Sequence, residues 1–310
     1  MVKINKIKKL SFAEKIFEDQ YSLIFTGSVI DDRTDHIEKL IVKNCDNSSV
    51  FRVKVDIENY VISFNEKQVR IAEIKDFLKE LSLSYDDVNV LIETTSLDFS
   101  EILYLIYGLN NLNKRIDVSL CYIEPEDYNN KKTHLKEKED FLLSDSRQKF
   151  IGLPIFSINS QDIDKSHLVA LLGFENHRLG QILEEYDGSA FSNLISMIGI
   201  PAFKPGWENR SIHRHIEYFE NLNTTMHSYP ATNPYELNIL LENFFNAYKK
   251  IVIASMGTKP AAIAAAVFLV NKTPFNSRNQ YVGAIYDFPN KTVGRSQGVG
   301  EIYKYELTIN

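Results

Sequence analysis

The stretch KKIVIASMGTKPAAIAAAVFL, residues 249–269, passes from an apolar run to an alanine-rich segment through Ser-Met-Gly-Thr-Lys-Pro. A run of Ile, Val and Ala without polar alternation is typical of a strand that helices cover on both faces. Proline suits the first turn of a helix, and a hydroxyl side chain suits the position that caps it. The stretch therefore predicts a buried strand that ends near Ser255, a turn, and a helix that begins near Pro260.

Further apolar runs of the same character predict further buried strands. They are Ser22–Phe25, Val88–Glu93, Ile116–Ile123, His167–Leu172 and Tyr281–Tyr286. Helical patterns lie between them: one follows a capping residue at Ser100, and another opens with Asn233-Pro234, a favourable helix start. The alternation of strands and helices predicts an α/β fold.

Three stretches of the first half have counterparts in the same order in the second half. Each pair shares a strand followed by a glycine, a hydroxyl-rich turn or a proline turn. The pairs are Leu23–Arg33 with Leu168–Arg178, the strand from Val90 with that from Ile251, and Cys121–Pro125 with Ile285–Pro289. Such ordered self-similarity predicts an internal duplication, with two Rossmann-like parallel-sheet halves.

The duplication predicts a boundary near residues 149–161, where Gly152 and Pro154 interrupt the pattern. We expect an N-terminal half over residues 1–150 and a C-terminal half over residues 151–310. The second half also carries an inserted loop and helix around residues 199–220.

Composition favours a cytoplasmic protein. The net charge of −6 argues against general nucleic-acid binding, and hydrophobic and charged contents of 44% and 25% are ordinary for a soluble domain. The N-terminus lacks the apolar stretch of a signal peptide, and the longest apolar run, residues 261–270, is too short to span a membrane. Of the two cysteines, Cys121 lies in an apolar run and is expected to be buried; no Cys/His spacing predicts a metal, and we expect no cofactor.

The turn after the strand from Ile251 is suited to a phosphorylated ligand. In doubly wound sheets, ligands bind beyond the carboxyl ends of the strands. Gly257 lets the backbone approach a ligand, Ser255 and Thr258 supply hydroxyls and helix caps, and Lys259 adds a positive charge near free amides. The equivalent turn of the first half, residues 94–98, lacks the glycine and lysine and is a poorer anion site.

A second candidate segment runs from Gly173 to Arg178. Arg178 is expected either to bind a phosphate or to pair with Glu175, and Asn176 lies beside them as a candidate ligand contact. If the protein is an enzyme instead, Glu175, His177 and Asp287 are the candidate catalytic residues.

The inserted segment offers a third group of candidates. Lys204, Trp207 and Arg210 lie on a turn that is expected to cover a nucleotide by stacking and charge. His213 and His215 are two positions apart in the expected helix, which makes them a poor metal pair, and we expect both on its surface.

The segment IASMGTKPAAIAAA, residues 253–266, resembles the CRISPR-associated Rossmann-fold (CARF) sensor domains, which have a hydroxyl- and glycine-rich turn with Thr-Lys after a central strand. The paired halves look like the fused arrangement of the related SAVED domains. The resemblance implies a cyclic-oligonucleotide sensor, with Gly257, Thr258 and Lys259 in one ligand loop and residues 173–178 in the other. The first half departs from the pattern because it lacks Gly-Thr-Lys, and no fused effector is recognisable.

The patterns predict a protein that binds a phosphorylated ligand at the strand ends, and the resemblance implies a bacterial nucleotide-binding sensor or regulatory subunit in anti-phage defence. A sensor without its own effector requires a protein partner or self-association. Two alternatives stay open: an enzyme of phosphodiesterase or glycosidase type that acts on a nucleotide or nucleic acid, and a structural subunit of a defence complex.

Overall fold

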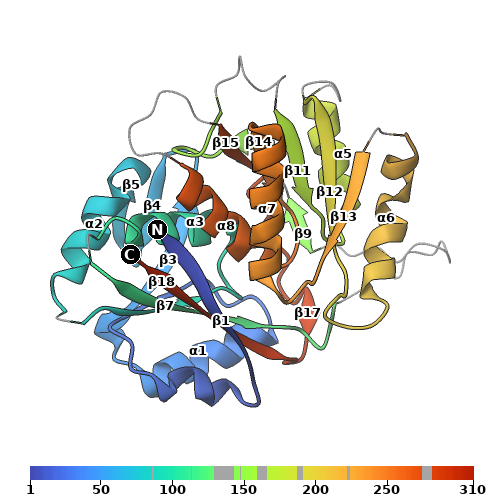
Figure 1. Ribbon diagram of the computed structural model, residues 1–310. Helices are drawn as coiled ribbons and strands as arrows, with labels where there is room; N and C mark the ends of the chain where they lie inside the picture. Colours follow the sequence, from blue (N-terminus) through green and yellow to red (C-terminus); the bar gives the residue numbers. More distant parts are fainter. Residues whose placement is uncertain are drawn as a thin grey trace. The chain divides into compact units, whose positions relative to one another are not determined.

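The computed structural model has an α/β fold and divides into two compact units (Figure 1). It describes residues 1–85, 87–112, 114–128, 143–146, 148–158, 166–186, 191–221, 224–273 and 281–310. Unit 1 comprises Met1–Asp145 and Lys291–Asn310, and unit 2 comprises Ser146–Asn290. The last segment of the chain thus folds with unit 1, whereas its sequence predicts a place in the second half.

Unit 1 has a mixed sheet whose described strands lie in the order β1-β18-β7-β6-β2-β3-β4-β5. The strands are β1 (Val2–Leu10), β2 (Leu23–Thr26), β3 (Val50–Asp56), β4 (Val61–Phe64), β5 (Lys67–Arg70), β6 (Asn89–Glu93), β7 (Ile116–Ile123) and β18 (Ile302–Ile309). β7, β6, β2 and β3 run parallel, while β18 lies antiparallel between β1 and β7. β18 belongs here because its buried side chains, Tyr305 among them, fill the core of this sheet.

The main helices of unit 1 are α1 (Asp32–Asn44), α2 (Ile74–Ser82) and α3 (Phe99–Leu109). α1 packs with the short helix Ala13–Glu18 on one side of the sheet, and α2 contacts α3. The expected cap of α3 at Ser100 is wrong: the helix begins one residue earlier, and Asp98 occupies the N-cap position. A short ladder between β8 (Asp127–Tyr128) and β17 (Ser296–Gln297) also belongs to unit 1.

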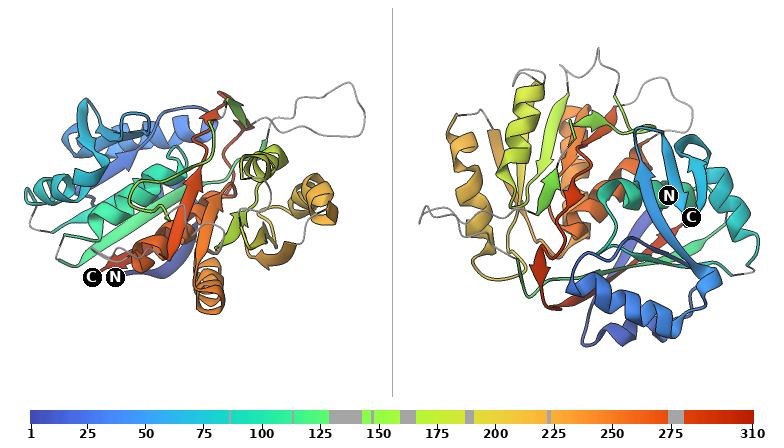
Figure 2. Two further views of the ribbon diagram at one scale, coloured as in Figure 1. Left: turned by 90° about the horizontal axis from the view of Figure 1, so that it is seen from above. Right: turned by 180° about the vertical axis from the view of Figure 1, so that it is seen from behind.

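Unit 2 has a sheet whose described strands lie in the order β10-β15-β14-β11-β12-β13. They are β10 (Ile151–Gly152), β11 (His167–Leu171), β12 (Asn193–Gly199), β13 (Thr224–Tyr229), β14 (Ile251–Ser255) and β15 (Val282–Tyr286). All neighbouring pairs are parallel except β10 with β15. α5 (Asn176–Glu185) and α6 (Trp207–Asn221) cover one face, and α7 (Pro234–Tyr248) and α8 (Lys259–Lys272) cover the other (Figure 2).

The buried strands that the sequence predicts are all present, as β2, β6, β7, β11, β14 and β15. The prediction is confirmed. These strands are recognisable in the sequence because each is buried on both faces and therefore has a continuous apolar run. In unit 2 the order β13-β12-β11-β14-β15 reverses between β11 and β14. Such a reversal is the switch point of a doubly wound sheet, beside which ligands bind.

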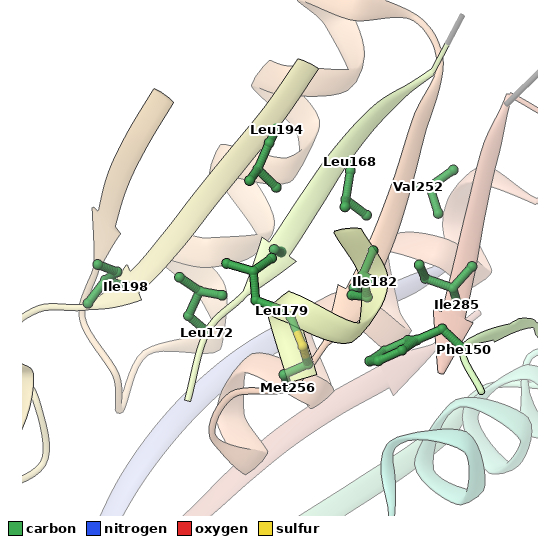
Figure 3. Close-up of a cluster of buried hydrophobic side chains, with 12 residues drawn as sticks. Phe150, Leu168, Leu172, Leu179, Ile182, Leu194, Ile198, Val252, Met256 and Ile285 are labelled. Atoms are coloured by element: carbon green, nitrogen blue, oxygen red, sulfur yellow. The ribbon is translucent and has the colours of Figure 1, made fainter. Parts of the chain in front are cut away.

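The core of unit 2 fixes the helices against this sheet. On one face, Leu179 and Ile182 of α5 point toward the strand side chains Leu168, Val252 and Ile285 (Figure 3). On the other face, every residue of α8 from Pro260 to Val270 is buried, and its small alanines bring the helix close to β14 and β15. The Ser255–Lys259 turn is therefore held at both ends by packed elements. Cys121 in unit 1 is fully buried, as the sequence predicts.

Among the described residues, no helix is both long and apolar enough to cross a membrane.

The position of β18 predicts a strong effect of one core substitution. Tyr305→Ala should lower the free energy of unfolding of unit 1 by about 3–5 kcal/mol, because Tyr305 is 0% exposed. Glu306→Ala, on the opposite face of the strand, should cost under about 1 kcal/mol, because it removes only a partly exposed ion pair with Lys8. Urea unfolding measures the free energy of unfolding of each variant. If Tyr305→Ala raised amide exchange in unit 2 rather than in β1 and β7, the assignment of β18 to unit 1 would be contradicted.

Candidate functional site

The turns after β11 and β14 touch at the switch point of unit 2. The amide of Met256 donates to the carbonyl oxygen of Leu171 at 3.0 Å. A Cβ atom at Gly173 would clash with the carbonyl oxygen of Met256, and one at Gly257 would lie 3.2 Å from the carbonyl oxygen of Leu172. Glycine at both positions therefore permits the close approach of the two turns. The structure brings together Gly173 and the segment Ser255–Lys259, which belong to two separate candidate loops in the sequence.

The N-terminus of α8 has no side-chain cap. Thr258 occupies the N-cap position, but its side chain makes no capping hydrogen bond. The expectation that Thr258 caps this helix is therefore wrong; its hydroxyl is buried and has no hydrogen-bond partner among the described residues. Glu175, the N-cap residue of α5, also makes no side-chain capping bond. Two helix N-termini of unit 2 thus keep their positive ends without a capping side chain.

In unit 1 the corresponding helix ends are matched by carboxylates. Asp31 caps α1 by accepting from the amide of Thr34 at 3.1 Å, and the amide of Asp98 donates to Glu101 Oε2 at 2.7 Å at the start of α3. The contrast between the units is electrostatic, because only unit 1 places its own negative charge at both of these helix ends.

The turn after β6 in unit 1 is also filled by the protein itself. The buried carboxylate of Glu93 accepts from the amides of Thr95 and Ser96, at 2.7 and 3.1 Å. Lys291 Nζ lies 2.8 Å from Asp98 Oδ1 and donates to the carbonyl oxygen of Ser96. The carboxylates of Glu93 and Asp98, together with a lysine that is already paired with Asp98, leave this turn poorly suited to an anion.

Arg178 forms a buried ion pair with Asp287. Arg178 Nε donates to Asp287 Oδ2 at 2.8 Å, and Nη2 donates to Oδ1 of the same carboxylate. The side chains are 7% and 0% exposed, and Glu175 Oε2 lies 4.0 Å from Arg178 Nη1. Burial would lower the pKa of Arg178, but the Asp287 charge raises it above its ordinary value. The guanidinium is thus committed to joining the start of α5 to the end of β15, which leaves the phosphate role of Arg178 without support.

The candidate catalytic residues lie together around this ion pair. His177 Nε2 is 3.9 Å from Glu175 Oε1, and its side chain is partly exposed. Asp287, by contrast, is fully buried against Arg178. Asn176 is turned to α6, where its side-chain amide donates to the carbonyl oxygen of Arg214 at 2.9 Å. The group has the chemistry for proton transfer only at its exposed edge, around His177.

The inserted segment supports the turn after β11. Trp207 is only 7% exposed, and its ring lies edge-on to Phe174 with centroids 5.9 Å apart. Lys204 Nζ lies 5.4 Å from the centre of the Trp207 ring, and Arg210 is half-buried on α6. Because the indole is enclosed, it offers no open face for a base to stack on. Ser211 adds to this support by donating from Oγ to the carbonyl oxygen of Gly173 at 2.8 Å.

The two histidines of α6 have opposite environments. His213 is exposed as expected, but the expectation of a surface position for His215 is wrong, since it is 1% exposed and its Nδ1 lies 2.9 Å from the carbonyl oxygen of Ser211. Burial lowers the pKa of His215 to about 4, against the opposing effect of that hydrogen bond. His215 is therefore a neutral core residue beneath the site.

Tyr229, which is not among the residues predicted from the sequence, also lies at the turn after β14. It is the last residue of β13 and is 2% exposed, and its hydroxyl oxygen would lie 3.4 Å from a Cβ atom at Gly257. The segment TTMHSY has no continuous apolar run, because β13 is the outermost described strand of its sheet and keeps exposed side chains. No local sequence signal marks this tyrosine.

Within the described part of the chain, no group of three His, Cys, Asp or Glu side chains is arranged to hold a metal ion.

The buried ion pair predicts a large loss of stability on neutralisation. Asp287→Asn should lower the free energy of unfolding by about 3–5 kcal/mol, because it leaves Arg178 buried without its counter-charge. Combining it with Arg178→Met should restore part of the loss. The matched control is Glu242→Gln, which breaks the partly exposed pair with Lys272 and should cost under about 1 kcal/mol. If Asp287→Asn were as stable as the wild-type protein in urea unfolding, the stabilising role of this ion pair would be contradicted.

The burial of His215 predicts that the protein loses stability at acidic pH. Its pKa is about 4 in the folded state and 6.5 as the reference value, so the unfolded state binds more protons between these pH values. Stability should fall as the pH drops from 6.5 to 4, by on the order of 3 kcal/mol. His215→Leu should flatten this part of the pH profile, and the exposed control His213→Gln should not. Equal slopes for both variants in unfolding measured from pH 4 to 7 would disprove the role.

No protein-family model matches the chain, and no curated protein was found to be similar to it.

Proposed function

We propose that the chain is a bacterial nucleotide-binding sensor or regulatory subunit of anti-phage defence, and that it binds a phosphorylated ligand at the switch point of unit 2. The observation that carries the proposal is the N-terminus of α8, which has no side-chain cap and lies at the carboxyl end of β14. Anions bind at such helix ends because amide hydrogens and the helix dipole both favour negative charge. Lys259, the first residue of α8, adds a full positive charge there.

The geometry suits a phosphate better than a larger uncharged group. Gly173 and Gly257 let the backbone come close, and unit 2 supplies no carboxylate cap at the start of α8. Glu175 is the acidic residue among the ligand candidates, and its Oε2 lies 4.0 Å from Arg178 Nη1, although that guanidinium pairs mainly with Asp287. A phosphate would supply the negative charge that the carboxylates of Asp31 and Asp98 supply to the helices of unit 1.

The duplication is part of the same proposal. The strands β7-β6-β2 of unit 1 and β15-β14-β11 of unit 2 have the same order and direction, and they hold the three paired stretches of sequence. The turns also match, since Gly27 lies against Ser96 in unit 1 as Gly173 lies against Met256 in unit 2. Two Rossmann-like halves from one ancestor account for this likeness, with the ligand site kept in the second half alone.

The sensor role rests on the resemblance to CARF and SAVED domains, and it makes cyclic oligonucleotides candidate ligands. A ligand that favours one conformation over another shifts the population and so changes the surface offered to a partner protein or a second copy. The second candidate is an enzyme, favoured by the position of His177 beside Glu175 at 3.9 Å. It ranks lower because Asp287, its third candidate, is buried in an ion pair.

The sensor proposal is tested by ligand screening. Cyclic oligonucleotides, mononucleotides and NAD are compared by thermal shift, where a ligand at 100 times its Kd adds about 2.7 kcal/mol. Lys259→Ala should weaken binding about ten-fold or more, because it removes a charged hydrogen-bond donor. Lys272→Ala, at the other end of α8, is the control of equal charge.

No shift with any ligand, or an equal shift in Lys259→Ala, would refute the proposed site. Turnover of a bound nucleotide that is lost in both Glu175→Gln and His177→Gln, with their melting temperatures unchanged, would favour the enzyme instead.

A further inference from the structure

Tyr229 brings a buried hydroxyl to the base of the unit 2 site from a strand that is remote in sequence. Its carbonyl oxygen accepts from the amide of Ile200 at 2.7 Å, which holds the end of β13 against the loop that follows β12. Its side chain is 2% exposed, and its hydroxyl lies against the position of Gly257. The tyrosine hydroxyl therefore approaches the turn after β14 from the interior of the unit.

Two buried hydroxyls meet at this point without a complete set of partners. Tyr229 Oη and Thr258 Oγ1 both lack a hydrogen-bond partner of good geometry among the described residues. They are neighbours, since burial raises the pKa of Tyr229 while the Thr258 hydroxyl lowers it in part. Burial has the larger effect, so the phenol keeps its proton and acts as a donor.

Counting hydrogens shows what this pair requires. Each hydroxyl carries one hydrogen to donate. If Tyr229 donates to Thr258, the hydroxyl hydrogen of Thr258 still needs an acceptor. If Thr258 donates to Tyr229, the hydroxyl hydrogen of Tyr229 needs one instead. One outside acceptor is therefore needed in every arrangement. A buried hydroxyl without one costs on the order of 1–3 kcal/mol.

We propose that Tyr229 is a specificity-determining residue of this site, whose hydroxyl, together with that of Thr258, donates a hydrogen bond to a phosphate oxygen of the ligand. The proposal rests on the phosphorylated ligand proposed above. The two hydroxyl oxygens have almost no exposed surface, and that of Tyr229 lies beside Gly257, so an acceptor that reaches them has to be small. A terminal phosphate fits this need, because one oxygen can enter while the others face the amides of α8 and Lys259.

The class of ligand follows from that geometry. An internal phosphodiester carries substituents on two of its oxygens, which makes it bulkier than a terminal phosphate near these buried hydroxyls. The site should therefore prefer a ligand with a terminal phosphate over one whose phosphates are all diesters, which ranks phosphomonoester nucleotides above the cyclic oligonucleotides that the CARF resemblance suggests. The donors available to a phosphate here are two hydroxyls, the first amides of α8 and the ammonium of Lys259.

The test uses inorganic phosphate and pyrophosphate as probes on the full chain, with affinity measured by calorimetry and stability by thermal unfolding. Tyr229→Phe should weaken binding of the probes about ten-fold, because it removes a hydrogen bond to a charged group. Its melting temperature without probe should be nearly unchanged, since one hydroxyl hydrogen lacks an acceptor both before and after the substitution. Tyr235→Phe, an exposed tyrosine at the start of α7, is the control.

Thr258 supplies a matched pair of variants. Thr258→Val should weaken the probes as Tyr229→Phe does, and Thr258→Ser should not, because serine keeps the hydroxyl. Neither variant should weaken α8, since the Thr258 side chain does not cap it. AMP compared with 3′,5′-cyclic AMP tests the preference for a terminal phosphate, and AMP should bind more tightly.

The outcomes separate the two proposals. If Lys259→Ala weakens a probe and Tyr229→Phe does not, the role of Tyr229 is overturned and the phosphate site stands. A lower melting temperature of Tyr229→Phe with unchanged affinity would show that the hydroxyls bind a buried water, which also overturns it. If the wild-type protein binds neither probe, or if neither substitution matters, both proposals fail.

Discussion

The close approach of two backbone turns at the switch point of unit 2 is the constraint on which its candidate site depends. β11 and β14 are parallel neighbours, and the chain leaves them toward α5 on one face and α8 on the other (Figure 2). Gly173 makes room for the carbonyl oxygen of Met256, so the two turns can meet. A side chain there would separate the turns and move the first amides of α8 and the Thr258 hydroxyl out of place.

Unit 1 has the same backbone contact and a different outcome. Gly27 would bring a Cβ atom to 2.8 Å from the carbonyl oxygen of Ser96, so this turn is equally close. There the carboxylate of Glu93 accepts from the amides of the turn, and Lys291 pairs with Asp98. In unit 2 the equivalent positions leave a helix end and two hydroxyls without such partners. Helix N-termini favour negative charge, which the protein supplies in one unit and a ligand is proposed to supply in the other.

How well each residue could be predicted depends on how far away its partner lies in the sequence. Arg178 was expected to bind a phosphate or Glu175, yet its main partner is Asp287, 109 residues further along the chain. Trp207 is expected to stack on a nucleotide, but it is buried against Phe174, 33 residues earlier in the chain. His215 is expected at the surface and is buried, because α6 packs against α5 and β12 with the face that carries this residue. In each case the environment is created by elements that are distant in sequence.

The sequence by itself determined the α/β class, the strands buried on both faces, and the turn Ser255–Lys259, because continuous apolar runs and Gly, Thr and Pro at a strand end are local signals. Only the tertiary structure decided that β18 joins unit 1, that Gly173 meets Met256, that Arg178 is taken by Asp287, and that Tyr229 reaches the site. These contacts join segments far apart in the chain, and strand order, which no local pattern encodes, brings them together.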